Sequence, residues 1–215
     1  MTIKNITFLR LSFTAALLFA PAAVAATPRP APRHYITGNH GVRVEVPDEL
    51  YYCPLPEGWV GSDHGTTLFL VAPADCEADG TPAISIFYAF NVVEHHRGDG
   101  EERPPRTDAE LRHDECPAGG GTVTGLRLLG RTVPGCSVRD GSRVTISANA
   151  VYSLERGWGM PDRTLAVTLS TSTERLSADL VTFHRLLSGI SICTPNWARS
   201  KAGRPGCHEW PGSWW

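Results

Sequence analysis

The sequence predicts an α+β fold: a single antiparallel β-sheet covered by one long C-terminal amphipathic helix plus a short helix, stapled by three disulfides. Three observations lead to this prediction. Six cysteines follow an apolar leader, runs of alternating apolar and polar residues recur along the chain, and an apolar stripe with helical spacing lies near its end.

The first 25 residues have the three parts of a secretory signal peptide. Lys4 and Arg10 give a positive start, Leu11–Ala20 is an apolar run, and Ala23–Ala25 is a small-x-small cleavage site. The apolar run is about half the roughly 20 residues that a membrane-spanning helix needs. We therefore expect cleavage, no lipid anchor because no cysteine follows the site directly, and a periplasmic or secreted mature protein.

The composition divides the rest of the chain into three parts. Residues 26–40 are a proline-rich spacer that we expect to be extended, residues 41–193 form the α+β domain, and residues 194–215 form a tryptophan-rich C-terminal segment tethered to it. A domain of this size can bury a core of its own. The disulfides are therefore expected to add robustness.

The charge balance argues against two classes of partner. The chain has 20 basic and 22 acidic residues, a net charge of −2, and the leader takes two of the basic residues with it. No basic stripe is present, which argues against nucleic acid and against strong attachment to anionic lipid. We expect partners that are neutral, mixed in charge or mildly basic.

The strands are predicted from alternation and from turn signals. Val42, Val44 and Val46 alternate with charged residues, so one face of this strand is buried. The Asp140-Gly141 pair lies between two strand-like runs and predicts a hairpin. The other expected strands are Leu50–Cys53, Thr67–Ala72, Ala83–Val93, Val144–Ser153, Thr164–Ser170 and Ile190–Cys193.

Two helices are predicted from capping signals and apolar spacing. Thr107 and Glu110 have the spacing of a capping box, and so do Thr171 and Glu174. The second pair precedes the best helix of the chain, which Gly189 ends. Its apolar stripe consists of Leu176, Leu180, Phe183 and Leu187.

Six cysteines allow fifteen pairings, and the sequence alone does not choose among them. Nearest-neighbour pairing closes the shortest loops, and each bridge is worth about 3 kcal/mol on the chain-entropy model. We favour this scheme over any crossed one. No C-x-x-C spacing supports zinc or redox chemistry, so the cysteines are expected to be structural. The expected pairs are Cys53/Cys76, Cys116/Cys136 and Cys193/Cys207.

Ser62, Asp63 and His64 are the residue types of a hydrolase triad, but they are adjacent in the chain. Neighbouring side chains diverge, so they cannot line up as nucleophile, base and orienting group. The G-x-S-x-G elbow is also missing. A turn bounded by glycines is the better interpretation.

A histidine-rich region is the candidate for metal binding. His95 and His96, with Glu94, His113 and Asp114, are possible ligands, but no H-x-x-x-H or H-E-x-x-H helix is present. A solvated loop is favoured. The three glycines at 119–121 lack the Lys-Ser/Thr of a phosphate loop. We predict no catalytic residue, no metal ligand and no cofactor.

The C-terminal segment is the candidate binding site. Four of the six tryptophans of the chain lie in its last 19 residues, namely Trp197, Trp210, Trp214 and Trp215. Tryptophan buries a large area at little entropic cost and is enriched at interface hot spots; it also stacks on sugar rings. The alternative is that this segment is a structural strap, which folds back and packs on the sheet of its own domain.

Two regions resemble the PsbP-like fold, found in an extrinsic photosystem protein and in bacterial envelope proteins. Val42–Pro47 with Leu55–Trp59 is similar to the family's strand followed by a Pro-x-Gly-Trp turn. Thr164–Thr171 leading into Leu176–Leu187, with a last strand at Ile190–Cys193, is similar to the family's ending. The resemblance implies a non-enzymatic protein that binds other proteins, with no catalytic residues to carry over.

Three functions remain open. The first is a non-enzymatic exported protein that binds another envelope or secreted protein, as an inhibitor, an immunity protein or an assembly factor. The second is a cell-wall or carbohydrate-binding module that uses the C-terminal tryptophans. The third is a hydrolase with an unrecognised site, built on Ser62 and His64 or on a carboxylate pair.

Overall fold

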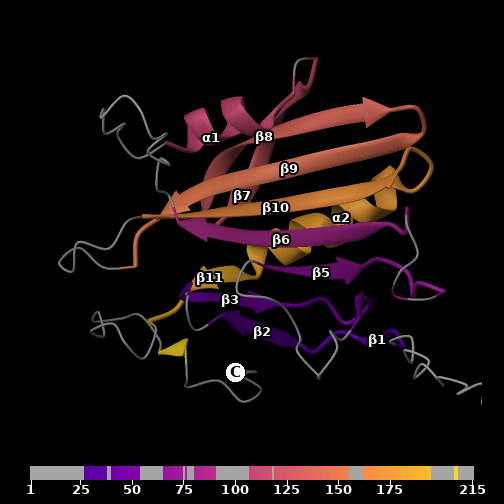
Figure 1. Cartoon of the computed structure of the whole chain (residues 1–215), viewed down its shortest axis with the longest axis horizontal. Coiled ribbons are helices and arrows are strands. Elements are labelled where there is room, and N and C mark those ends of the chain that lie inside the picture. The colour runs from indigo at the N-terminus through magenta and orange to yellow at the C-terminus, as the bar shows by residue number, and fades with distance from the viewer. Residues whose placement is uncertain are drawn as a thin grey trace, which may run out of the picture.

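The computed structural model describes residues 27–37, 40–53, 65–74, 76, 80–90, 107–117, 119–154, 162–194 and 206–207. The predicted signal peptide lies outside them. The described chain is α+β, with a large antiparallel sheet in the strand order β1-β4-β5-β6-β10-β9-β8-β7 (Figure 1). These strands are β1 (Arg29–Pro30), β4 (Tyr51–Tyr52), β5 (Gly65–Phe69), β6 (Ala83–Phe90), β7 (Gly121–Leu128), β8 (Arg131–Asp140), β9 (Arg143–Tyr152) and β10 (Arg163–Ser172).

A second, three-stranded sheet is present that the single-sheet prediction did not include. It has the order β11-β3-β2, with β3 (Val42–Glu45) between β2 (His34–Thr37) and β11 (Ile190–Ile192). Strand β2 and the two-residue β1 both come from the segment that we treated as a spacer. That segment therefore contributes paired strands to both sheets.

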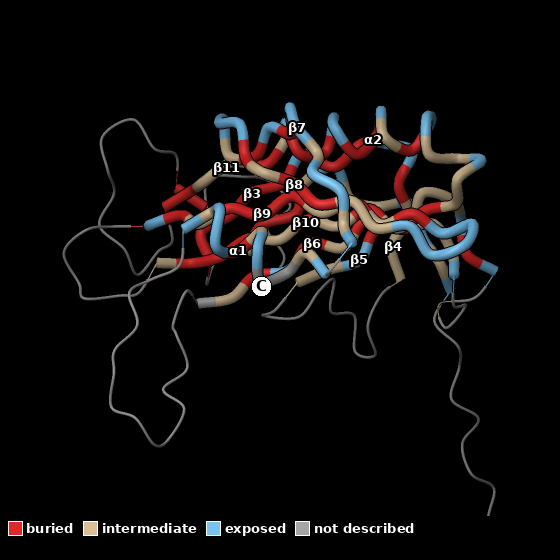
Figure 2. The backbone as a smooth tube through the Cα atoms, turned by 90° about the horizontal axis from the view of Figure 1, so that it is seen from above, coloured by how far each residue is buried: buried red, intermediate tan, exposed pale blue. Residues whose placement is uncertain are grey.

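The hydrophobic core joins the large sheet, the small sheet and helix α2 (Leu176–Ser188). Strands β6, β9 and β10 bury alternate residues on one face, as period-2 patterning requires. Helix α2 lies on that face, and helix α1 (Asp108–Glu115) lies on the opposite side of the sheet (Figure 2). The fully buried side chains from these elements include Ile84, Ile86, Leu165, Leu169, Phe183 and Leu187.

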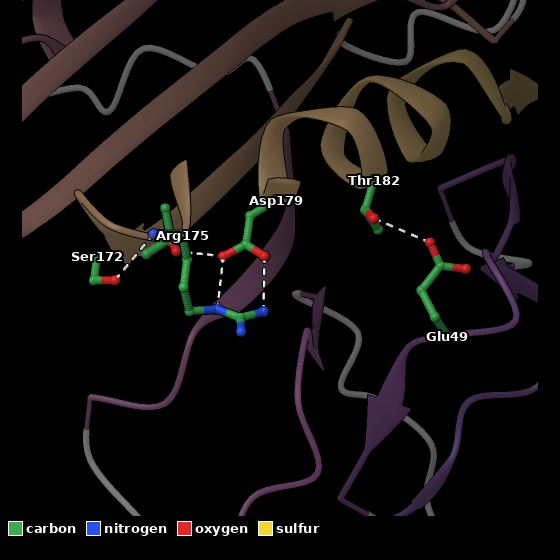
Figure 3. A network of polar contacts seen from close by, with 6 residues as sticks. Glu49, Ser172, Arg175, Asp179 and Thr182 are labelled. Atoms are coloured by element: carbon green, nitrogen blue, oxygen red, sulfur yellow. Dashed lines mark hydrogen bonds and ion pairs between the residues drawn. The ribbon is translucent and has the colours of Figure 1, made fainter. Parts of the chain in front are cut away.

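The start of helix α2 differs from the prediction. Thr171 and Glu174 do not cap it; the N-cap is Arg175, which makes no side-chain capping bond. Thr171 still belongs to β10 and donates its hydroxyl to the carboxylate of buried Asp179. Arg175 donates to the same carboxylate through Nε at 3.2 Å and Nη2 at 2.9 Å (Figure 3). This network joins the first turn of α2 to the edge of the core.

A second polar contact holds the middle of α2. Glu49, in the chain between the two sheets, accepts a 3.0 Å hydrogen bond from the hydroxyl of Thr182 (Figure 3) and pairs with Arg185. The Arg185 and Glu49 side chains are both more than one-third exposed, so this pair is worth at most about 1 kcal/mol. Apolar burial therefore dominates the docking of α2.

Helix α1 begins with the predicted capping box. Thr107 Oγ1 accepts from the Glu110 amide, and the Thr107 amide donates to the Glu110 carboxylate at 2.7 Å. This backbone hydrogen bond lowers the pKa of Glu110. The next residue, Asp108, accepts from the Val151 amide of β9 at 2.6 Å and pairs with Arg131 of β8. Helix α1 thus provides a hydrogen-bond acceptor for the Val151 amide, which lies past the residues of β9 that pair with β8.

All three nearest-neighbour disulfides are present: Cys53–Cys76, Cys116–Cys136 and Cys193–Cys207. The second joins the end of α1 to β8, and the third joins the end of β11 to the C-terminal segment. The predicted hairpin is also confirmed, since Asp140 pairs with Arg143 across Gly141, whose φ is +57°. A glycine fits there because other residues rarely adopt the left-handed conformation.

Candidate functional site

The described structure contains the base of the predicted binding segment. Trp197, Trp210, Trp214 and Trp215 themselves lie outside the described residues. Gly206 and Cys207 are described, and Cys207 is fully buried. The position of Cys207, which precedes Trp210, Trp214 and Trp215 in the sequence, is therefore known.

This base, which we call the C-terminal anchor, consists of Cys193, Thr194, Gly206 and Cys207. Thr194 and Gly206 form a parallel β-bridge, and the Cys207 amide donates to the Thr194 carbonyl at 2.9 Å. The Cys193–Cys207 disulfide packs with Ile36 of β2 in a small apolar cluster of its own. A covalent bond, backbone hydrogen bonds and buried apolar contacts together hold this part of the chain.

The C-terminal anchor contacts a tight turn at Gly41, which comes just before β3. The Cys193 amide donates to the Gly41 carbonyl at 2.9 Å. Gly41 has a φ of +63°, and a Cβ there would lie 2.4 Å from Leu154 Cδ2 and 2.9 Å from the Cys193 carbonyl. Only glycine fits both the conformation and the space. The C-terminal anchor therefore rests against the turn that opens β3.

Beside this turn lies a buried polar group that sequence reasoning did not find. The His40 ring stacks on the Tyr88 ring with centroids 5.3 Å apart. Tyr152 donates its hydroxyl to the His40 carbonyl at 2.9 Å and lies opposite Arg163 across β9 and β10. All four residues are buried. They come from the turn before β3 and from strands β6, β9 and β10, so no local spacing signals the group.

Burial changes the acid–base properties of this group. It raises the pKa of the Tyr88 hydroxyl well above its usual value, and nearby Tyr35 and Tyr152 raise it further. Burial likewise raises the pKa of Tyr152, while Arg163 opposes that shift. Both tyrosines are therefore neutral at physiological pH, and the group is a hydrogen-bonding and packing site rather than a source of phenolate.

Two phenylalanine substitutions distinguish the roles of these tyrosines. The Tyr88 hydroxyl has no hydrogen-bond partner among the described residues, so Tyr88→Phe is expected to preserve the free energy of unfolding or raise it by about 1–3 kcal/mol. Tyr152→Phe removes a made hydrogen bond and is expected to lower it by about 0.5–1.5 kcal/mol. Urea denaturation measures both; a larger loss for Tyr88→Phe than for Tyr152→Phe would contradict this interpretation.

Of the other candidate residues, only His113 and Asp114 are among the described residues. Ser62, Asp63, His64, Glu94, His95 and His96 lie outside the described residues. His113 is exposed on α1, and Asp114 is in the same helix. Within the described ranges, no group of three or more His, Cys, Asp or Glu side chains could hold a metal ion. No helix in those ranges is long and apolar enough to cross a membrane.

Comparison with known proteins finds similarity at the level of the fold. No protein-family model matches the chain, and no curated protein matches it. The solution structure of cyanobacterial PsbP (CyanoP) from Synechocystis sp. PCC 6803 is similar, at 13% identity and a TM-score of 0.41. The match covers 82% of this chain and 98% of that one. This match is weak and partial, and it is to a PsbP, the protein after which the fold that the sequence resembles is named.

Proposed function

We propose that this chain is an exported, non-enzymatic protein that binds another envelope or secreted protein through its tryptophan-rich C-terminal segment. The C-terminal anchor is the observation that carries the proposal. A disulfide, a β-bridge and an apolar cluster with Ile36 hold Cys207 in place. The chain then continues for eight residues, of which three are tryptophan.

A fixed base favours binding because it reduces the entropy that the segment loses when it contacts a partner. Tryptophan adds to this advantage, since its large side chain has only two rotatable bonds to order. Trp197 lies between Cys193 and Cys207 in the sequence, so it belongs to the loop that the third disulfide closes. An inhibitor or immunity protein, or an assembly factor, needs such a preorganised contact.

The export part of the proposal depends on one sequence feature, the leader, and on the disulfides. The leader has the composition of a signal peptide, and the six cysteines are all paired. Protein disulfides persist mainly in oxidising compartments. We therefore assign the mature protein to the periplasm or to the extracellular medium.

The proposal is tested with a variant in which Trp210, Trp214 and Trp215 are replaced by alanine. Affinity capture from the envelope fraction identifies a stoichiometric protein partner of the unchanged chain, and calorimetry then measures its dissociation constant. Each hot-spot residue is worth about 2 kcal/mol or more, so the triple variant is expected to bind at least about 100-fold more weakly. The melting temperature is expected to stay within about 2 °C.

Val181→Ala serves as the control, because Val181 is 65% exposed on α2 and is not one of the residues of the C-terminal anchor. This variant is expected to bind like the unchanged chain. The opposite pattern for the triple variant, a large fall in melting temperature with binding intact, would identify the segment as a strap that packs on its own domain. Failure to capture any stoichiometric partner also counts against the proposal.

A further inference from the structure

Helix α1 docks on the sheet face opposite α2, and polar contacts hold much of it there (Figure 2). Asp108 accepts a 2.6 Å hydrogen bond from the Val151 amide. Arg112 donates to the Gly135 carbonyl at 3.3 Å and to the Thr122 hydroxyl at 2.6 Å. These contacts are only partly buried or are exposed, so water competes for the same groups. They therefore hold the helix weakly.

Apolar burial adds little to this docking. Leu111 is 1% exposed and is the one buried residue among the described side chains of α1. It belongs to neither of the two apolar clusters that the described residues form. A helix of eight residues is too short to be stable in water by itself, so α1 depends on its contacts with the sheet. Elements with few buried apolar contacts are the ones that open locally.

A buried polar side chain beneath α1 opposes the docking. Asn149 of β9 is 1% exposed, and its amide nitrogen and oxygen have no hydrogen-bond partner among the groups that the structure describes. Val151, the first contact of α1, is two residues further along β9 and therefore on the same face. Gly135, the second contact, pairs with Ala148 beside Asn149. An unpaired buried amide has lost its hydrogen bonds to water, so the docked position carries a cost that opening removes.

The C-terminal end of α1 is fixed covalently. The Cys116–Cys136 disulfide joins the residue after the helix to β8. Gly120 packs closely on this bond, since a Cβ there would lie 2.5 Å from Cys116 Sγ and 2.8 Å from Cys136 Sγ. This end cannot leave the sheet while the disulfide is intact. The other end, at Asp108, is held to the sheet by hydrogen bonds and an ion pair.

We propose that α1 is a lid on this face, hinged at the Cys116–Cys136 disulfide, that opens at its N-terminal end and exposes the Asn149 amide. Opening gives up the burial of Leu111 and the polar contacts of Asp108, and it lets solvent or a ligand pair with the amide. A ligand that offers an acceptor and a donor side by side binds the open position and shifts the population toward it. The lid is independent of the proposed function, because it involves no residue of the C-terminal anchor.

Hydrogen exchange of the full disulfide-bonded chain, followed by nuclear magnetic resonance, tests the lid. The Val151 amide reports on it directly, since its acceptor is the Asp108 carboxylate, and the Leu111 amide reports on the helix. Both amides are expected to exchange at least about 100-fold faster than the Val167 amide of the central strand β10. Their rates are expected to change little with urea below the unfolding transition, because local opening exposes little surface. One common rate and urea dependence for all three amides would overturn the proposal.

Substitutions on the two sides of the lid give the second test. Asn149→Leu keeps the branching and size class of the side chain but needs no hydrogen bond, so it is expected to slow exchange of the Val151 amide at least about 10-fold. Asn149→Ala, which tolerates a tight fit, is expected to slow it by a smaller factor. Asp108→Ala is expected to speed exchange of the Leu111 amide about 10-fold.

Ser147→Ala is the matched control, because Ser147 lies on the same face of β9, two residues before Asn149. Exchange of the Val151 amide is expected to stay within about twofold of that in the unchanged chain. If neither Asn149 variant slows exchange of the Val151 amide, the buried amide does not oppose docking and the proposal is wrong. It is also wrong if Asp108→Ala leaves the exchange of the Leu111 amide unchanged.

Discussion

Phe183→Ala is expected to lower the free energy of unfolding by about 3–5 kcal/mol, the largest loss among the variants considered. Phe183 is completely buried and lies on the face of α2 that packs into the core shared with both sheets. Removing the ring takes apolar area from the core and leaves a cavity that rigid strands cannot fill. Urea denaturation followed by circular dichroism measures the loss.

Val181→Ala is the matched control on the same helix. Val181 is mostly exposed, so its truncation is expected to change the free energy of unfolding by no more than about 0.5 kcal/mol. A loss below 1 kcal/mol for Phe183→Ala would mean that α2 does not contribute to the core in the way described.

Gly41→Ala is expected to cost about 2–4 kcal/mol. About 1–2 kcal/mol comes from forcing alanine into the left-handed conformation, and the rest from overpacking against Leu154 and the Cys193 carbonyl. The substitution is expected to disturb the C-terminal anchor as well, because Gly41 accepts the hydrogen bond of the Cys193 amide.

Gly141→Ala separates these two contributions. Gly141 has a similar φ of +57°, but a Cβ there would meet no atom within 4 Å. It is therefore expected to cost only the conformational part, about 1–2 kcal/mol. Equal losses for the two variants, measured by thermal or urea denaturation, would show that the crowding at Gly41 has no energetic consequence.

Local signals predicted the elements that depend on neighbouring residues. The Asp140-Gly141 pair predicted the β8–β9 hairpin, and the Thr107–Glu110 capping box predicted the start of α1. The apolar stripe that includes Phe183 predicted α2, because amphipathic spacing directly reflects which side of a helix is buried.

The start of α2 shows where a local signal fails. Thr171 and Glu174 have capping-box spacing, but Thr171 continues β10 and pairs with Val144 of β9. Its hydroxyl bonds to Asp179 instead. Spacing alone does not show that the strand extends past the expected helix cap.

The second sheet was missed for two reasons. Strand β11 pairs with β3 from near the other end of the chain, so no local signal joins them. Strand β2 is close to β3 in the sequence, but its four residues lie in the segment that its prolines marked as a spacer. The buried group around His40 and Tyr88 also depends on contacts between residues far apart in the sequence. For the disulfides, in contrast, the preference for the pairing that closes the shortest loops was enough to predict all three bonds.

The most direct test of the proposed function is site-specific photo-crosslinking in the producing cells. A benzophenone amino acid replaces Trp214 in one variant and Val181 in another. We expect one discrete protein adduct from position 214, identifiable by mass spectrometry, and none from position 181. No adduct from position 214, or the same adducts from both positions, would contradict the claim that the C-terminal segment is the protein-binding site.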